Sequence, residues 1–362
     1  MKLEPMSGEN RLTWPDLARG LSVLLVVLHH VVRQMVQSGP ISWQAAAMAW
    51  TFLDEFLTPI RIPLFFFISG YFAAKAVNGN PAQRHRAWLV PAYLYVLWTI
   101  LLTLRLLVPG GDDEHSFSAN LLGNLIFAGS GYWYLYALPL YFVYTHLTRS
   151  LPGWLAAVPL VAGLIFRESI SDWAQSLSEP IMDGPTLIGS IAANGIFFWV
   201  GARFGRGLTS QLSSRPTWIA ISVALGYSIA QIAAMSAGMQ EWTLPLLSFI
   251  GIGVGVMLAS RARAEFALSR ALRYVGQRTL PVYVLQFFFI SVLSLAWGRL
   301  GQASAVEAAT AASWLYPLVV TALISMISLV AYRLAMLSSW TTWLFRPPSF
   351  LFSERRGANR RR

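Results

Sequence analysis

The chain has 362 residues, of which 56% are hydrophobic and 12% are charged, with no cysteine and a net charge of +11. A soluble domain typically carries about 25% charged residues, so this composition excludes an ordinary soluble protein and indicates a polytopic membrane protein. The absence of cysteine excludes disulfides and cysteine-ligated metal sites, and no bound metal is expected. The positive charge does not indicate nucleic-acid binding, because the basic residues cluster at the ends of apolar segments, where membrane topology places them.

Apolar runs of about 17–25 residues, bounded by charges, proline or glycine, predict an all-α bundle of ten membrane-spanning helices. The first run is not expected to be a signal peptide, because Arg19 and two histidines interrupt it. The spans should form one membrane domain over residues 1–345, followed by a short basic tail at 346–362. They are expected near residues 15–36, 54–75, 87–108, 132–148, 151–167, 187–204, 217–238, 243–260, 279–298 and 313–337.

The connecting loops predict how the bundle is oriented. With an even number of spans, the loops rich in Arg and Lys, such as 75–86, all fall on one side. Acidic residues, such as those at 112–114, collect on the other side. Both termini are therefore expected in the cytoplasm, with the protein in the cell (inner) membrane and its basic tail attracted to anionic lipids.

Four ionisable side chains interrupt the first predicted span: Asp16, Arg19, His29 and His30. Such groups are costly at membrane depth and usually face the protein interior or a water-filled cavity. His30 follows Arg19 by eleven residues, which is three helical turns plus about 20° and a rise of about 16 Å. Arg19 and His30 therefore share one face with Asp16, whereas His29 points about 80–100° away.

In the second span, two prolines flank Arg61. Proline frees backbone carbonyls, which need polar partners, so Arg61 is predicted to face the bundle interior. The alternative is that Arg61 extends to the outer interface or pairs structurally with Asp54 or Glu55. Ser69 and Gly70, further along this span, are expected to permit close helix packing.

Three further sets of residues are candidates for binding or packing. Arg84 and Arg86 lie in a basic loop that would hold a phosphorylated donor, although topology alone also produces basic loops. Trp133 and Tyr134 open the fourth span, and each joins an apolar face to a polar tip, which suits either a substrate path or interfacial anchoring. Gln286, in the ninth span, needs a partner that an interhelical hydrogen bond would supply.

Four motifs occur in order along the chain: DLARGLSVLLVVLHH, RIPLFFFISGYF, GYWYLYALPLYF and VGQRTLPVYVLQ. Together they resemble the integral-membrane acyltransferase 3 family, a group of O-acyltransferases that modify glycans, antibiotics and lipids. The family signature of an Arg or Lys, ten residues and a His selects Arg19 and His30 here. The resemblance covers most of the chain and matches the ten-span core of the family.

The chain departs from the family pattern in three places. One residue separates Arg84 from Arg86, where the family often has two residues between the arginines. Gln286 stands where many members have His, so a second histidine role does not carry over. No soluble esterase-like domain follows the last span, so transfer is expected to be completed by the membrane domain or by a separate periplasmic or extracellular protein.

These observations predict an O-acyltransferase that moves an acetyl or succinyl group from cytoplasmic acyl-CoA to a hydroxyl of a glycan, lipid-linked sugar or other acceptor, with no permanently bound cofactor. His30 is the predicted general base, Arg19 positions the donor, and Arg61 positions substrate or stabilises the oxyanion. A covalent acyl-histidine is the alternative mechanism. The competing classes are a proton-coupled transporter or flippase and a non-catalytic scaffold or sensor. The predicted substrate-binding residues are Asp16, Arg84, Arg86, Trp133 and Tyr134.

Overall fold

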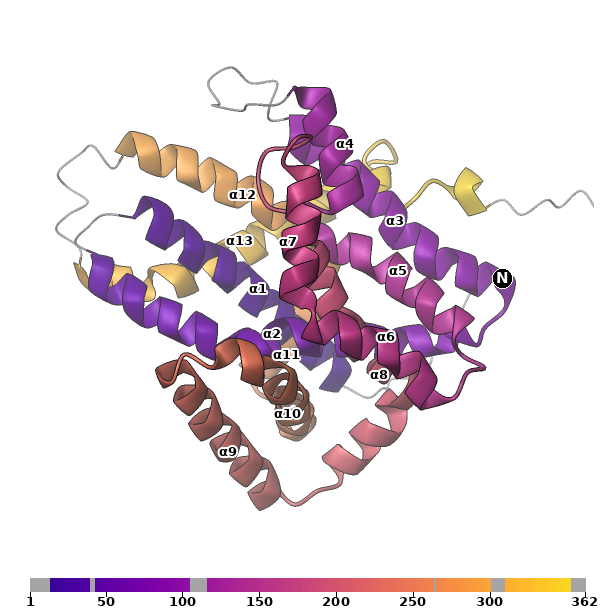
Figure 1. Cartoon of the computed structure of the whole chain (residues 1–362). Coiled ribbons are helices and arrows are strands. Elements are labelled where there is room, and N and C mark those ends of the chain that lie inside the picture. The colour runs from indigo at the N-terminus through magenta and orange to yellow at the C-terminus, as the bar shows by residue number, and fades with distance from the viewer. Residues whose placement is uncertain (1–13, 40–42, 105–115, 264, 301–309, 353–362) are drawn as a thin grey trace, which may run out of the picture.

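A computed structural model shows the fold and describes residues 14–39, 43–104, 116–263, 265–300 and 310–352. Every regular element in these ranges is a helix, which confirms the predicted all-α class (Figure 1). The acidic loop predicted around 112–114 and the last ten residues of the predicted basic tail, 353–362, lie outside the described residues.

A helix lies at the place of each of the ten predicted spans. Six of the described helices are long and apolar enough to cross a membrane: α1, α2, α3, α9, α10 and α13. α6 and α7 form a seventh candidate if this pair, which bends by 68° between Ile165 and Arg167, is one broken span. The protein is therefore a multi-pass membrane protein, while the count of ten spans and the cytoplasmic termini remain predictions. The helices are α1 (Trp14–Ser38), α2 (Gln44–Val77), α3 (Pro81–Thr103), α4 (Phe117–Phe127), α5 (Trp133–Leu147), α6 (Gly153–Ile165), α7 (Arg167–Ser178), α8 (Ile188–Ser213), α9 (Thr217–Ser236), α10 (Gln240–Arg261), α11 (Ala267–Gly276), α12 (Thr279–Leu300), α13 (Thr310–Ala335) and the 3-10 helices η4 (Thr342–Leu344) and η5 (Ser349–Phe352).

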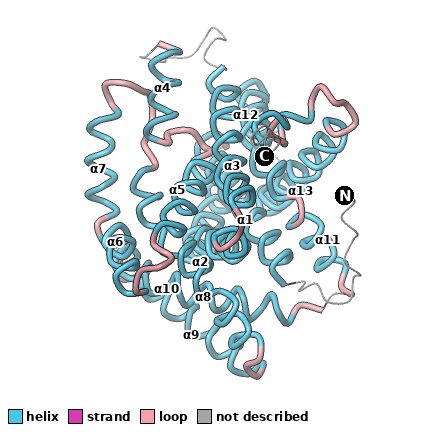
Figure 2. Tube along the Cα trace, turned by 90° about the vertical axis from the view of Figure 1, so that its right-hand side faces the viewer, coloured by secondary structure: helices cyan, strands magenta, loops and turns pink. Residues whose placement is uncertain are grey.

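α1 and α2 lie at the centre of the bundle. Figure 2 shows them in the middle of the molecule, with α4, α6 and α7 along one edge and α11 toward the opposite edge. On α1, Val23, Val27 and Val31 are completely buried, at a spacing of four residues that keeps them on one helical face. The bundle interior therefore surrounds the helix that carries the predicted Arg19–His30 face.

Glycines allow the central helices to approach their neighbours closely. A Cβ atom at Gly70 of α2 would lie 1.9 Å from the carbonyl oxygen of Phe198 in α8, and one at Gly201 of α8 would lie 2.0 Å from the carbonyl oxygen of Phe67. No side chain fits at such distances, so the α2–α8 crossing requires glycine on both helices. Gly20 lets α1 approach α11 in the same way. The expectation that Gly70 permits close packing is confirmed.

The segment after α13 folds back onto α3. The indole nitrogen of Trp98 donates a hydrogen bond to the carbonyl oxygen of Leu344 at 2.9 Å, and the Tyr93 hydroxyl donates to that of Trp343 at 3.1 Å. Phe345 is buried against Trp98, with ring centroids 5.8 Å apart. Packing onto α3 continues into η5, which lies within the stretch 346–362 that the sequence predicted as a tail.

Candidate active site

Ionisable side chains of α1 and α2 meet inside the bundle. Nδ1 of His29 lies 2.7 Å from Oδ2 of Asp54, and Nη1 of Arg61 donates a hydrogen bond to Oδ1 of the same carboxylate. Arg61 is only 6% exposed, so the prediction that it faces the interior is confirmed. Its partner is Asp54, as the structural alternative proposed. Asp54 therefore holds His29 and Arg61 in one network.

His30 lies beside this network. Its ring centroid is 5.0 Å from that of His29 and 4.8 Å from that of Phe287 on α12, with an edge-to-face angle of 64° between the rings of His30 and Phe287. A carboxylate that binds one imidazole fixes the orientation of that ring. The structure thus places His29 and Asp54 beside His30, where they form part of its surroundings. The contact between His29 and Asp54 could not be predicted from the sequence, because 25 residues separate the two along the chain.

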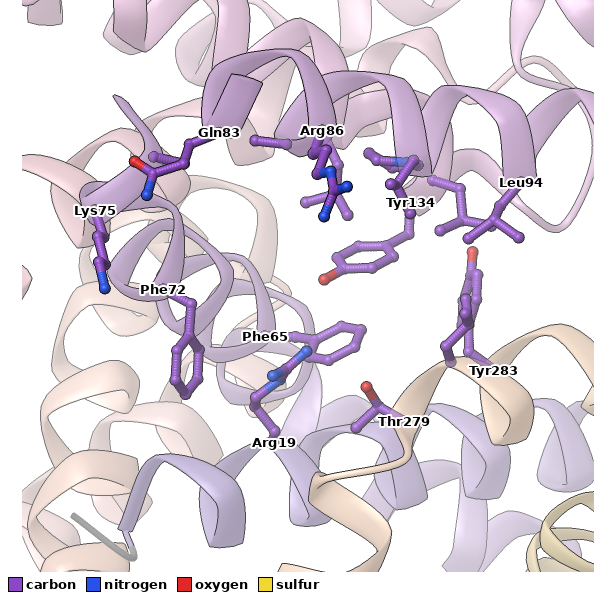
Figure 3. A pocket seen from close by; sticks show the side chains of 17 residues that line it. Arg19, Phe65, Phe72, Lys75, Gln83, Arg86, Leu94, Tyr134, Thr279 and Tyr283 are labelled. Atoms are coloured by element: carbon purple, nitrogen blue, oxygen red, sulfur yellow. The ribbon is translucent and has the colours of Figure 1, made fainter. Parts of the chain in front are cut away.

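A cationic cavity of about 660 Å³ lies between α1, α2, α3, α5 and α12, and we call it the Arg19 cavity. Arg19, Lys75 and Arg86 reach it from α1, α2 and α3, and Figure 3 shows Arg19 and Arg86 pointing into it from opposite sides. Among the described residues, no acidic side chain lines it, so it suits an anionic ligand such as a phosphate. Its lining consists of Arg19, Phe65, Phe72, Lys75, Ala76, Gln83, Arg86, Ala87, Val90, Pro91, Leu94, Tyr134, Leu135, Leu138, Thr279, Leu280 and Tyr283.

The start of α3 determines which arginine enters this cavity. The Gln83 N–H donates to the Asn80 side chain at 2.9 Å and the Asn80 N–H donates to the Gln83 side chain at 3.3 Å, which forms a capping box. From this fixed start, Arg86 lines the Arg19 cavity, whereas Arg84 donates to the carbonyl oxygen of Gly79 at 2.6 Å. Gln83 also lines the cavity, and the sequence signal that points to its place is the capping motif formed by Asn80 and Gln83.

The other predicted binding residues lie in different surroundings. Asp16 is 4% exposed and accepts a hydrogen bond from Gln277 at 3.1 Å, while the Arg19 guanidinium stacks over the ring of Phe72 at 4.9 Å. Tyr134 lines the Arg19 cavity, whereas Trp133 lines a second cavity of about 270 Å³, which we call the Trp133 cavity. Two adjacent residues of α5 therefore line two different cavities.

An aromatic layer lies between the Arg19 cavity and His30. Tyr283 of α12 lines the cavity, and its ring centroid is 6.4 Å from that of Phe287, one turn further along the helix. Tyr132 packs against Phe287 at 5.3 Å and against Tyr283 at 6.2 Å. Two hydrogen bonds hold the layer in place. The Tyr132 hydroxyl donates to the carbonyl oxygen of Val284 at 2.8 Å, and the Tyr283 hydroxyl donates to that of Gly131 at 2.9 Å.

Gln286, next to Phe287, is completely buried. Its side-chain oxygen and nitrogen both lack a hydrogen-bond partner among the described residues. The interhelical hydrogen bond expected for Gln286 is therefore not found in this part of the chain. A buried amide of this kind carries a desolvation cost of about 1–3 kcal/mol.

Comparisons with known proteins identify the family of this chain. Residues 12–336 match the family described as "Acyltransferase domain", whose profile is Acyl_transf_3. The chain is 25% identical to "Inner membrane protein YcfT" of Escherichia coli (strain K12), over 93% of this chain and 96% of that protein. No solved structure matches the chain. Because the family match extends from before α1 to the end of α13, the chain belongs to the integral-membrane acyltransferase 3 family.

Proposed function

We propose that this protein is an O-acyltransferase of the cell inner membrane, with ten spans and both termini in the cytoplasm. It transfers an acetyl or succinyl group from cytoplasmic acyl-CoA to a hydroxyl of a glycan, a lipid-linked sugar or another acceptor. One observation carries the proposal: α1 presents Arg19 to a cationic cavity and His30 to a buried ionisable cluster. The two residues are eleven positions apart, about 16 Å along the helix.

The Arg19 cavity is suited to the phosphorylated end of the donor. Guanidinium groups bind phosphate oxygens through paired N–H donors, and Arg19 and Arg86 approach the cavity from two sides, with Lys75 as a third cation. The pantetheine arm then runs along α1 toward His30. Tyr283 and Phe287 lie across that route, so donor binding has to turn at least one of these rings aside.

In the proposed reaction, His30 removes the proton from the acceptor hydroxyl as its oxygen attacks the thioester carbon. The new C–O bond forms and the C–S bond breaks. The departing CoA sulfur takes the proton back from the imidazolium and leaves as a thiol. Arg61, held by Asp54, is the candidate to stabilise the oxyanion formed on the carbonyl oxygen. In the alternative path, His30 attacks the thioester carbon first, the C–S bond breaks and CoA leaves as a thiol with the proton from the imidazole. The acceptor oxygen then attacks the acyl-imidazole, the C–N bond breaks and the imidazole takes up the hydroxyl proton.

The test uses purified protein with labelled acetyl-CoA and measures CoA release and acylated product. His30→Ala should abolish transfer in protein that inserts and purifies normally, whereas His29→Ala should be much milder. Arg19→Ala should weaken donor binding. A His30→Ala protein with full transfer would overturn the mechanism, and an Arg19→Ala protein with unchanged acyl-CoA affinity would make that arginine purely structural.

The second candidate function is a proton-coupled transporter or flippase. The buried His29–Asp54–Arg61 network favours it, because intramembrane ionisable networks of this kind also form proton paths. The same assay separates the two functions, since a transporter consumes no thioester and forms no acylated product. Membership of the acyltransferase family supports the enzyme.

A further inference from the structure

We propose that a polar cavity beside Phe287 binds one sugar unit of the acceptor. This inference rests on the proposed acyl transfer and adds the place and the chemical class of the second substrate. The cavity, which we call the Phe287 cavity, has a volume of about 260 Å³ and lies between α3, α4, α12 and the loops around 129–131 and 183–185. Six polar side chains line it: Thr103, Asn120, Asn124, Ser130, Asp183 and Ser291.

Its position follows from α12. Thr279, Leu280 and Tyr283 line the Arg19 cavity, whereas Phe287 and Ser291, the next turns of the same helix, line the Phe287 cavity. The two cavities therefore occupy successive stretches of α12. On α1, Arg19 belongs to the first stretch, and His30 contacts Phe287 at the start of the second. This order places His30 between a donor site and a separate acceptor site.

Phe287 forms the partition between the Phe287 cavity and His30. Its ring lines the cavity, and its centroid lies 4.8 Å from that of His30. The ring also lies against Gly131, where an added Cβ atom would come within 2.5 Å of it. The proposal requires rotation of this one side chain, which would join the cavity to the imidazole and bring an acceptor hydroxyl to the base.

The polar lining is fixed before a ligand arrives. Asn120, only 2% exposed, donates its amide to Oδ2 of Asp183 at 2.6 Å and accepts the Asp183 N–H at 2.8 Å. These two hydrogen bonds fix the orientation of the Asp183 carboxylate. Ser130 is held by a hydrogen bond of 3.0 Å to the Thr99 hydroxyl. Fixed groups of this kind cost little ordering when a ligand binds.

The surrounding loops are fixed in the same way. The hydroxyl of Thr186 donates to the carbonyl oxygen of Phe127 at 2.6 Å, and its N–H donates to the Gln175 side chain at 3.0 Å. The loop that carries Asp183 is thus attached to α4 and to α7. Tyr136 anchors α4 to α5 through a bond of 3.1 Å to the carbonyl oxygen of Ile126. The cavity is therefore largely pre-formed, as small-molecule sites usually are.

The lining indicates a polyhydroxylated ligand. Each sugar hydroxyl is both a donor and an acceptor, which matches a mixture of a carboxylate, amides and hydroxyls. An acyl chain of a lipid would require an apolar lining. Among the described residues that line this cavity, Leu102, Pro185 and Phe287 are apolar, whereas six carry polar side chains. The occupant that we infer is a single pyranose unit, with the hydroxyl to be acylated directed at Phe287.

The experiment supplies acetyl-CoA with methyl glucoside, methyl galactoside, methyl mannoside or methyl rhamnoside, and compares them with 1-butanol. CoA release and ester formation are measured for each probe. Asp183→Asn keeps the shape of the side chain but removes its charge, and it should raise the glycoside KM by about 10- to 100-fold. Asn124→Ala should raise it by about 3- to 10-fold. The KM for acetyl-CoA should not change in either variant.

Asn194→Ala is the matched control, because Asn194 is also a helical asparagine but lines the Trp133 cavity. It should leave the glycoside KM unchanged. A rise in the glycoside KM for Asn194→Ala, with none for Asn124→Ala or Asp183→Asn, would move the acceptor site to the Trp133 cavity. Basal CoA release without stimulation by any glycoside would overturn the sugar class.

A second measurement uses water as the acceptor. Phe287→Ala should raise CoA release in the absence of any glycoside, because it opens the Phe287 cavity to His30, and Phe287→Ala/His30→Ala should abolish that increase. An unchanged rate would overturn the partition role of Phe287. If the wild-type protein releases no CoA under any condition, the proposed acyl transfer itself fails, and that result differs from all outcomes above.

Discussion

Removal of the Asp54 charge tests whether the buried ion pair is structural or catalytic. The side chains of Arg61 and Asp54 are only 7% and 14% exposed, so Asp54→Asn leaves a buried guanidinium without its counterion. Loss of one partner of a buried ion pair typically costs about 3–5 kcal/mol. Arg61→Gln should cost less, because His29 lies 2.7 Å from the carboxylate and can neutralise it by binding a proton.

The double variant Asp54→Asn/Arg61→Gln should recover most of this stability, since no buried charge remains and the two amides can bind each other. Unfolding in mixed micelles with increasing sodium dodecyl sulfate measures the free energy of unfolding of the wild type, the two single variants and the double variant. These four values give the coupling energy between Asp54 and Arg61. CoA release is measured on the same preparations. We expect stability to return in the double variant while transfer stays low, because the oxyanion loses its guanidinium.

Two results would refute this reasoning. If the double variant loses as much stability as the two single variants together, Asp54 and Arg61 do not interact. Full transfer by the stable double variant would exclude Arg61 from the chemistry and leave it only the structural role. Glu55→Gln is the matched control, because Glu55 is the exposed neighbour of Asp54, and its stability should change by no more than about 0.5 kcal/mol.

Two further predictions compare paired variants. Arg86→Met should raise the KM for acyl-CoA by about 10- to 100-fold, since it removes a charged contact from the Arg19 cavity. Arg84→Met should leave this KM unchanged, because Arg84 binds a backbone carbonyl. Equal effects of the two variants in initial-rate measurements would contradict the assignment of Arg86, and not Arg84, to the donor site. Gly201→Ala should destabilise the protein by about 1–3 kcal/mol through overpacking against α2. Gly207→Ala, on the same helix but with open space around its Cβ position within the described structure, should not, and equal melting temperatures of the two variants in detergent would contradict the close crossing.

Much of the fold follows from local pattern. Apolar runs set the positions of the helices, because each run has to satisfy its backbone internally in a membrane, and a helix lies at each predicted span. The 3.6-residue period likewise places Arg19 and His30 on one face of α1 without reference to any other helix. Composition, helix positions and this pair of residues were therefore determined by the sequence itself.

Contacts between helices depend on the tertiary structure. Which helices touch, and at which depth, is determined by crossings such as that of α2 and α8 at Gly70 and Gly201, and helical periodicity carries no information about a partner helix. Only the folded bundle therefore decided that His29 of α1 binds Asp54 of α2.

The same reason explains the separation of residues that are neighbours in sequence. Arg86 enters the Arg19 cavity while Arg84 binds a backbone carbonyl, and Tyr134 and Trp133 line different cavities. Residues one or two positions apart on a helix point in directions that differ by about 100–200°, so adjacency in sequence does not imply a shared site. The sequence by itself determined the membrane class and the Arg19–His30 face. The tertiary structure decided the partners of that face, because those contacts join helices that are distant along the chain.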